Sequence, residues 1–397
     1  MTYPEYVCRI AFVSAPYAAS PTWVDVSDDL MSFNRRRGRQ HELNRMEAGT
    51  ATVVLRNTSG DYWPNNSGSP YYGNIQPRKR INIRAVWDGT TYDLYTGYIE
   101  KWQPGFRAKA GFGAIMTLTC SDLIKPLSKL LLNSAGYSSE LTGDRIDNVL
   151  DTLGYPAAHR VIDAGQTTLQ ATGALANVNA MNHLFAVTDT ELGMLFVRGD
   201  GYVIFQDRHA RLKTPYTVSQ AIFGNDRAAG ELPIYEITPS LDDSLIYNDI
   251  RITRLSGTEQ TASDATSIAS YGKQGLQKPS MLMTTDSEAQ SQAQYLLGRY
   301  KDAYMRLEGL VAKAGLDPDD LYPAVLGFDI STRITVRLDQ AGINRDYYIE
   351  GIDQRWSKDS PGDLDTKWQV TDASLDAFWV LEIAGYSELS ITTRLSY

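Results

Sequence analysis

Residues 24–77 constrain the fold of this chain more than any other stretch, because they place a strand with one buried face between turn signals. Within residues 49–57, apolar and polar side chains alternate, which is the period-two pattern of a half-buried strand. Residues 57–61 end this strand with turn chemistry, and a loop that carries aromatic residues between prolines follows. An arginine-rich bend is expected before the strand, at residues 34–39. This part of the chain is therefore expected to fold as a sheet.

The first 121 residues show strand patterns almost throughout. Alternating or β-branched runs are separated by Gly, Pro, Asn or Asp, and Asp88 with Gly89 is a typical hairpin tip. Strands at such short spacing indicate a small barrel or sandwich. The expected strands are residues 6–13, 49–57, 80–88, 91–103 and 113–121.

At residue 122 the spacing of the apolar residues changes from the strand period to the helix period. The second of three expected helices is ended by Gly154 and Pro156, and a pair of strands follows the third. Residues 122–232 are therefore expected to form a separate α+β domain. Its expected helices are residues 123–131, 141–153 and 178–192, and its strand pair is residues 194–198 and 202–207.

Strand patterns return after residue 232. Thr285 and Glu288 then form a capping box, and apolar residues follow on one side of a helix that is expected to end near residue 306. Residues 233–383 are interpreted as a second β domain with this one amphipathic helix. Residues 384–397 are interpreted as a tail or a short final strand. The length of 397 residues is sufficient for two to four domains.

The chain is acidic, with a formal net charge of −9 at pH 7. Affinity for a phosphate backbone comes from clustered Lys and Arg, so this balance argues against specific binding of nucleic acid, although DNA could slide past an acidic surface. No apolar run approaches the roughly 20 residues that span a bilayer, and the first residues lack a signal region, so we expect folding in a cytoplasm and no membrane insertion. Cys8 and Cys120 are expected to be small buried residues.

The sequence carries no recognisable catalytic or metal-binding motif. Its four histidines lack metal-ligand spacing, and the usual nucleophile and phosphate-loop motifs are absent. The carboxylate pairs Asp242–Asp243 and Asp319–Asp320 could in principle act as acid and base, but both lie in turn-like stretches and are interpreted as solvated or helix-capping acids. We therefore expect no enzyme activity, no cofactor and no metal. The histidines, interpreted as surface or satisfied polar residues, are His41, His159, His183 and His209.

Two groups of residues remain candidates for binding. The arginine cluster could contact phosphates, form a solvated bend or pair with an acidic neighbouring subunit, and the acidic chain favours the last two interpretations. The loop aromatics could stack on sugars, but the prolines around them favour packing or a subunit interface. The candidate interface residues are Arg35, Arg36, Arg37 and Arg39 in the cluster, and Tyr62, Trp63, Tyr71 and Tyr72 in the loop.

The stretch from Gly38 onward resembles the minor tail proteins that serve as baseplate or tail-tip hubs in bacteriophages with long non-contractile tails. The resemblance rests on the pattern GRxxxLxxxxAGTATVxLxNxxGxYxPxN and on later patches in the same order, among them RINIR at 80–84, YTGYIE at 95–100 and YYIEG at 347–351. It covers most of the chain. The fold it implies is mainly β with an α+β insertion: two tail-tube-like β-barrel hub domains, residues 1–121 and 233–383, on either side of the inserted domain.

The resemblance also implies a structural function without bond making. Three copies would form a ring that joins the six-fold tail tube to the three-fold tip and leaves a central channel for the tape-measure protein and DNA. The implied partners are a distal tail protein, the C-terminal end of the tape-measure protein, and a spike, fibre or receptor-binding protein, all in the tail tip of the virion. Two alternatives stay open: a multi-domain β adhesin that binds host carbohydrate, and a cell-wall hydrolase with an unrecognised carboxylate pair.

Overall fold

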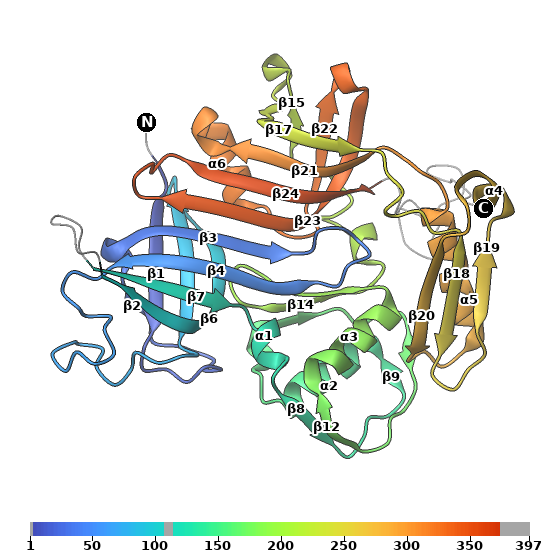
Figure 1. Ribbon diagram of the computed structural model, residues 1–397, viewed down its shortest axis with the longest axis horizontal. Helices are drawn as coiled ribbons and strands as arrows, with labels where there is room; N and C mark the ends of the chain where they lie inside the picture. The colour runs from blue at the N-terminus through green and yellow to red at the C-terminus, as the bar shows by residue number, and fades with distance from the viewer. Residues whose placement is uncertain (1–2, 107–113, 374–397) are drawn as a thin grey trace.

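A computed structural model describes residues 3–106 and 114–373 of the chain. Over these ranges a fourteen-stranded sheet runs through the molecule, and four small sheets of two or three strands accompany it (Figure 1). Most helices lie in two smaller units beside the large sheet. The predicted mainly-β fold with an α+β insertion is confirmed.

The first half of the large sheet contains five antiparallel neighbours in the order β3-β4-β7-β6-β5. Two further strands, β1 and β2, extend the β5 edge. Alternate residues of β4, Ala51, Val53 and Leu55, are buried in the core, as their period-two pattern predicts. The strands are β1 (Glu5–Ala11), β2 (Val24–Asp25), β3 (Leu30–Gly38), β4 (Glu47–Arg56), β5 (Arg80–Trp87), β6 (Thr90–Gly105) and β7 (Ile115–Ser121).

The second half of the large sheet repeats this arrangement. Its five strands pair antiparallel in the order β17-β21-β24-β23-β22, so each strand has the same neighbours as its counterpart in the first half. The chain visits the five positions in the same sequence both times. We call these two five-stranded units the first and the second β module. The second consists of β17 (Glu236–Ser240), β21 (Arg306–Lys313), β22 (Arg333–Leu338), β23 (Ile343–Ser357) and β24 (Leu364–Asp372).

The two β modules also match in local detail. The sequence Tyr-Ile-Glu occurs at 98–100 in β6 and at 348–350 in β23, and in both strands the ladder to the next strand shifts register at the glutamate. In both, the isoleucine exchanges backbone hydrogen bonds with the two residues that precede the neighbouring strand. The first of these two residues, Arg78 or Ser331, has a positive φ, 68° or 70°. The neighbouring strands then begin Arg-Ile-Asn-Ile-Arg and Arg-Ile-Thr-Val-Arg. The chain therefore contains one module twice.

The two β modules are joined by direct pairing of β3 with β23. The antiparallel register runs from Gly38 opposite Gly351 to Ser32 opposite Ser357, and Figure 1 shows the two strands side by side. Because β23 also pairs with β22 and β24, it belongs to both halves of the sheet. One core cluster accordingly contains buried residues from both β modules. The sequence predicted two β domains but gave no sign of this continuous sheet.

An α+β unit follows the first β module and has its own core. Its helices α2 and α3 pack against each other beside short strands, as the helical spacing predicted. The strands β15 (Ile222–Gly224) and β16 (Leu232–Pro233) already belong to the large sheet, because β16 pairs with β15 and β15 pairs with β22. The chain therefore returns to the large sheet before the boundary expected at residue 232. The unit contains α1 (Ile124–Leu127), β8 (Leu131–Ser134), β9 (Glu140–Leu141), α2 (Thr142–Thr152), β10 (Arg160–Ile162), β11 (Thr168–Leu169), β12 (Leu175–Asn179), α3 (Ala180–Glu191), β13 (Met194–Val197) and β14 (Val203–Gln206).

A third unit is inserted between β17 and β21, within the expected second β domain. The predicted helix begins at its capping box, where the Thr285 side chain accepts a hydrogen bond from the Glu288 N–H, but it ends at Tyr300. This helix packs on a three-stranded sheet of its own unit rather than on the second β module. The unit contains β18 (Asp249–Arg254), β19 (Gln260–Ser263), α4 (Ala265–Tyr271), β20 (Gly275–Met281) and α5 (Asp286–Tyr300).

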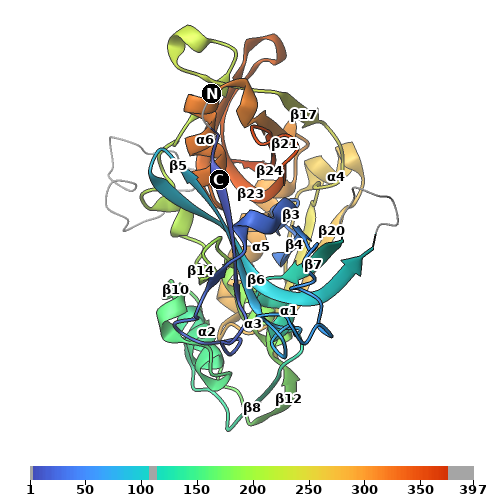
Figure 2. The same cartoon turned by 90° about the vertical axis from the view of Figure 1, so that its left-hand side faces the viewer.

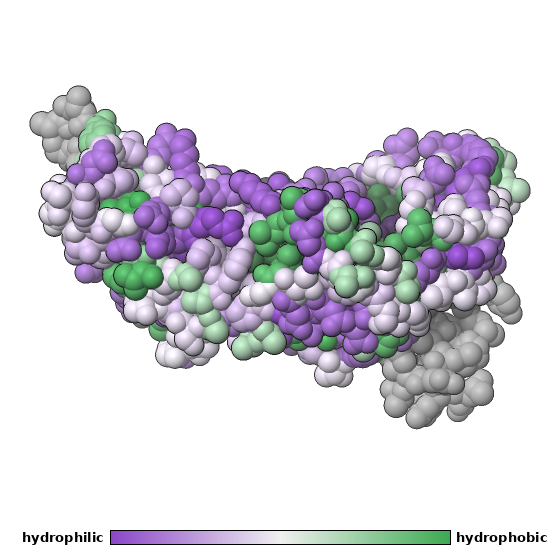
Figure 3. Space-filling model, turned by 90° about the horizontal axis from the view of Figure 1, so that it is seen from below, coloured by the Kyte–Doolittle hydropathy of each residue, from purple (hydrophilic) through white to green (hydrophobic). Residues whose placement is uncertain are grey.

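The remaining helix, α6 (Pro318–Gly327), lies between β21 and β22 and packs on the large sheet. Figure 2 shows the second β module at one end of the molecule and the α+β unit at the other. From below, in Figure 3, the molecule is elongated and bowed, with separate apolar patches on a largely hydrophilic surface. The last residues of the expected second β domain, 374–383, and the expected tail at 384–397 lie outside the described residues.

The β3–β23 pairing leads to a prediction about Gly38, which has φ +93° and whose added Cβ would overlap the backbone of Glu350 and Gly351. Gly73 has a similar φ of +78° but open space around it. We expect Gly73→Ala to lower the free energy of unfolding by about 1–2 kcal/mol, the cost of the backbone conformation alone. Gly38→Ala should lose about 1–3 kcal/mol more through overlap. Urea unfolding of the two variants measures the difference, and equal losses would contradict a tight β3–β23 contact.

Candidate functional site

The arginine cluster forms the end of strand β3, so the predicted bend at 34–39 is wrong. Side chains alternate between the two faces of a strand, and along β3 Arg35 and Arg37 are buried while Arg36 is exposed. The strand continues through the arginines because β4 pairs with it on one side and β23 on the other. The backbone amides that were expected to be solvated therefore belong to the centre of the sheet.

The two buried arginines of β3 bind groups from distant parts of the same chain. Arg35 is 2% exposed, and its Nε donates to Gln354 Oε1 at 2.8 Å on β23. Arg37 is 4% exposed, donates to the Val197 carbonyl at 3.0 Å and pairs with Asp329 at 2.9 Å. Burial lowers the pKa of the Arg35 guanidinium well below its usual value. These contacts tie β3 to the second β module and to the α+β unit.

Arg39 takes part in a buried ion triad at the centre of the molecule. The carboxylate of Glu350 is fully buried and accepts from Arg39 at 2.7 Å and from Arg211 at 2.6 Å. Burial by itself disfavours the charged carboxylate, but the two guanidiniums outweigh burial and lower the pKa of Glu350 to about 2. Arg39 directly follows β3, Glu350 lies in β23, and Arg211 lies after β14, the last strand of the α+β unit. The triad therefore connects these three segments of the chain.

The arginine cluster therefore makes most of its contacts with residues of the same chain. Within the described residues, Arg35 and Arg37 have too little exposed surface to meet a neighbouring subunit, and Arg39 is committed to Glu350. Arg36 is different: its side chain is 45% exposed and makes only a surface pair with Glu47 at 3.4 Å. The expectation of an interface contact stays a proposal for Arg36 alone.

The aromatic loop divides into an inner and an outer pair. Tyr62 is buried and donates its hydroxyl to Asp29 at 2.9 Å, and its ring stacks on Tyr71. Tyr71 in turn stacks on Phe12, with ring centroids 4.0 Å apart. Tyr62 therefore lies in the core and Tyr71 packs against it, as the packing interpretation predicted.

The outer pair, Trp63 and Tyr72, lies at the surface. The Trp63 ring meets Phe106 edge-on at 5.6 Å, and the Phe106 side chain is 73% exposed. Phe106 follows directly after the last residue of β6. A large exposed ring supported by a second ring is a common feature of protein interfaces.

Strands β6 and β17 of the two β modules each have an unpaired stretch of edge within the described part of the chain. Beyond Ile99, β6 pairs only with β7, so its other edge is open from Lys101 to Gly105. Strand β17 pairs only with β21, and its outer edge is open. Open strand edges are templates for pairing with another chain.

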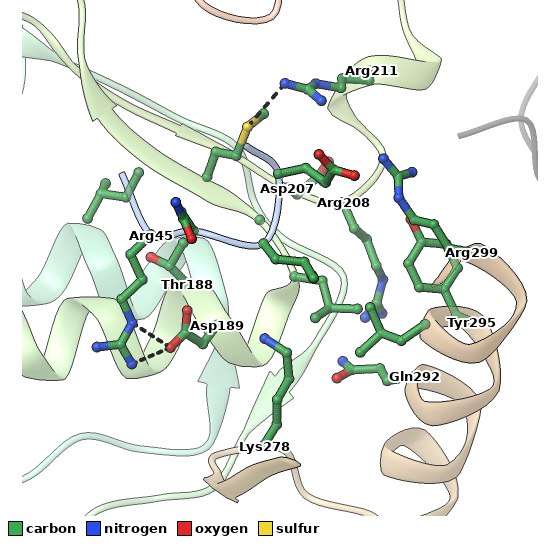
Figure 4. Close-up of a pocket in the computed structure, with 18 of the residues that line it drawn as sticks. Arg45, Thr188, Asp189, Asp207, Arg208, Arg211, Lys278, Gln292, Tyr295 and Arg299 are labelled. Atoms are coloured by element: carbon green, nitrogen blue, oxygen red, sulfur yellow. Dashed lines mark hydrogen bonds and ion pairs between the residues drawn. The ribbon is translucent and has the colours of Figure 1, made fainter. Parts of the chain in front are cut away.

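A cavity of about 380 Å³ lies where the β3–β4 loop, the α+β unit and the third unit meet. In Figure 4, Lys278 of β20 points into it between Asp189 at the end of α3 and Gln292 on α5. Arg45 enters from the β3–β4 loop and pairs with Asp189, with Arg45 Nε 2.9 Å from the carboxylate. Sequence reasoning missed this site because its residues come from five separate segments.

The residues examined for catalysis occupy structural positions. Asp242 accepts hydrogen bonds from Ser240 and Ser244, which lower its pKa to about 2, and Asp319 and Asp320 lie in the first turn of α6. Among residues 3–106 and 114–373, no group of three His, Cys, Asp or Glu side chains is placed to hold a metal ion. No helix in that part of the chain is long and apolar enough to cross a membrane.

Comparison with known proteins adds information on the fold. No family model and no curated protein matches the sequence. A tail protein from Neisseria meningitidis MC58 matches the structure with a TM-score of 0.61 at 13% identity, over 94% of this chain and 98% of that one. The 43 kDa tail protein of prophage MuSo2 from Shewanella oneidensis gives 0.59 at 13% identity with the same coverage. A chain of the Francisella PdpA–VgrG complex gives 0.53 at 8% identity, over 98% of this chain and 54% of that one.

At these identities the comparison establishes the fold alone, and this chain has the fold of these two tail proteins over nearly its whole length. The mainly-β tail-protein fold expected from the sequence resemblance is confirmed.

The ion triad predicts how stability depends on pH. Because the pKa of Glu350 falls from its usual 4.5 to about 2 on folding, its contribution is complete above about pH 5 and is lost as the pH falls toward 2. Glu350→Gln removes the carboxylate that Arg39 and Arg211 share and should cost about 3–5 kcal/mol at pH 7. Arg36→Gln, which breaks only a surface pair, should cost less than about 1 kcal/mol.

Chemical unfolding between pH 2.5 and 7 measures both effects. The variant Glu350→Gln should show a flatter decline of stability below pH 5 than the unmodified chain. A decline of unchanged steepness would show that other carboxylates carry the acid sensitivity.

Proposed function

We propose that this chain is a structural hub of a phage tail tip, in which three copies form a ring. The duplicated β module carries the proposal. A six-fold tube ends on six equivalent surfaces, and three copies of a chain with two like modules supply six. The fold shared with a prophage tail protein and with a second tail protein supports a place in the tail.

Within the described residues, one strand pairing joins the two β modules, and the ring would repeat it between chains. Within the chain, β3 of the first β module pairs with β23 of the second. The counterpart of β3 in the second module is β17, and the counterpart of β23 in the first is β6. The same contact between neighbouring copies would therefore pair β17 of one copy with β6 of the next. Both strands have an open stretch of edge within the described residues.

The correspondence extends to single residues. In the internal contact, Phe33 of β3 lies opposite Trp356 of β23, and their rings pack at 5.6 Å. Phe33 corresponds to Ile237 in β17, because each pairs with the equivalent residue of the following strand. Trp356 corresponds to Phe106, six residues after the glutamate of the shared Tyr-Ile-Glu sequence. An exposed phenylalanine thus lies where the internal contact has a packed tryptophan.

Two prolines modify this contact. Pro104 in β6 and Pro239 in β17 lack an N–H, so the ladder between copies would have fewer hydrogen bonds than β3–β23. Edge prolines also reduce non-specific strand pairing. The apolar contact of Phe106, supported by Trp63, would then carry more of the association.

The proposed ring would also have a channel and partners in the tail tip. A central channel would admit the tape-measure protein and DNA, and the net charge of −9 would let DNA pass without being held. A distal tail protein would bind above the ring, and a spike, fibre or receptor-binding protein below it. The Francisella structure is a complex between PdpA and VgrG, which agrees with assembly as the role of this fold. The ring would be part of the virion and would assemble in the host cytoplasm.

Cysteine pairing tests the proposed contact. In a chain carrying Phe106→Cys and Ile237→Cys, mild oxidation should produce covalent dimers and trimers on a non-reducing gel, because the two positions face each other across neighbouring copies. The native Cys8 and Cys120 are buried and unpaired, so they should not contribute.

A matched control replaces Phe106→Cys by Val161→Cys, an exposed position on β10 of the α+β unit. The control should stay monomeric on the gel. Monomer in the test variant, or equal crosslinking in both, would contradict the β17–β6 contact.

A further inference from the structure

The helix α6 connects the two β modules at a second place, besides the pairing of β3 with β23. It lies between β21 and β22 of the second β module and packs against β5 and β6 of the first (Figure 2). The Tyr322 ring lies 4.7 Å from the Trp87 ring, measured between centroids, and Gly327 lies against the Tyr92 ring. Trp87 and Tyr92 both belong to the hairpin of β5 and β6. A contact between a helix and a hairpin therefore accompanies the strand pairing.

The first β module has a counterpart of α6, which is the aromatic loop, residues 57–79. Both segments connect the second strand of their module to the third: α6 lies between β21 and β22, and the aromatic loop lies between β4 and β5. The strands that follow, β5 and β22, both begin with Arg-Ile. Counted back from these arginines, residues 322–327 of α6 correspond to residues 69–74 of the loop, which include Tyr72.

The aromatic loop presents Tyr72 on a fixed backbone. Successive turns order the loop, and in one of them the Tyr72 N–H donates to the Ser69 carbonyl at 3.1 Å. The neighbouring ring of Tyr71 stacks on both Phe12 and Tyr62. Tyr72 itself is 55% exposed. Because the loop is already ordered, little conformational entropy is lost when a partner covers this ring.

The aromatic loop also borders the open edge of β6. Trp102 lies in the open stretch of that edge, and its Nε1 donates to the Gln76 carbonyl at 2.9 Å. Trp63 contacts Phe106, which directly follows β6. A chain that pairs with this edge would therefore meet the aromatic loop at the same time.

The hairpin of β22 and β23 is the counterpart of the hairpin that α6 covers. Counted from the same arginines, Leu338 corresponds to Ala85 and Gln340 to Trp87. Trp87 is buried beside α6, whereas Gln340 and the rest of the tip, residues 339–342, are exposed. Leu338 is half-buried. The second β module thus has an exposed surface where the first has a covered one.

We propose that Tyr72 of one copy packs on the β22–β23 hairpin of the next copy, against Leu338 and the tip. The inference rests on the proposed ring, and the partner is a second copy of this chain. Within the chain, α6 belongs to the module that contributes β23. Between copies, the aromatic loop belongs to the module that contributes the equivalent strand, β6. This contact would offset the hydrogen bonds that Pro104 and Pro239 remove from the ladder.

Photocrosslinking from position 72 of the full chain tests this contact. Tyr72→p-benzoyl-phenylalanine replaces one exposed ring by another. Irradiation should give a band of two or three chain masses on a denaturing gel, and mass spectrometry of that band should find a crosslink to residues 337–345. The matched control carries the same probe at Tyr271, an exposed tyrosine of α4 in the third unit, and should not give this crosslink.

A second variant measures how much the contact contributes to assembly. Tyr72→Ala should raise the chain concentration at half-assembly about tenfold, because the loss of a buried aromatic side chain weakens an interface by about this factor. Tyr271→Ala should leave that concentration unchanged. Light scattering over a dilution series measures both.

The outcomes separate this contact from the ring itself. A three-copy mass and the crosslink between Phe106→Cys and Ile237→Cys, without a crosslink from position 72 to residues 337–345, would overturn the loop–hairpin contact and leave the ring. The same holds for that crosslink in the monomer band alone, or for an unchanged half-assembly concentration of Tyr72→Ala. A chain that stays monomeric and forms neither crosslink would overturn both proposals.

Discussion

The pairing of β3 with β23 is the contact on which the rest of this structure depends. It joins the two β modules into one sheet, and it brings the arginines of β3 against groups from the second β module and the α+β unit. Strand pairing fixes the register of β3 against β23. Each buried guanidinium adds directional hydrogen bonds that hold β3 against its other neighbours. Arg39 and Arg211 meet on one fully buried carboxylate, so a shift of either neighbour would leave charge without its partner.

In the proposed ring, this internal contact is repeated between neighbouring chains. The two modules have equivalent edges, so the strand pairing that joins them within one chain can also form between the equivalent edges of two chains. The open edges of β6 and β17 are those edges in this molecule. The inserted units lie beside the sheet (Figure 1).

Local patterns predicted the elements well and their long-range relations poorly. The alternation at Ala51, Val53 and Leu55 and the capping box at Thr285 depend on near neighbours in sequence, and both are confirmed. The Arg35–Arg39 segment looked like a solvated bend because its partners lie about 300 positions away: Gln354 accepts a hydrogen bond from Arg35, and Glu350 pairs with Arg39. The cavity around Lys278 was missed for the same reason. One signal was available: Tyr-Ile-Glu and the Arg-Ile-x-[Ile/Val]-Arg run each occur twice, in the same order.

The central claim, that the duplicated module builds a three-copy ring, is tested most directly by the native mass of the purified chain. Light scattering should give about three times the subunit mass of 44.2 kDa, and end-on images of the same fraction should show a ring with six similar lobes around a hole. A dimer, an open filament, or a three-copy particle without the six-lobed ring would contradict the account.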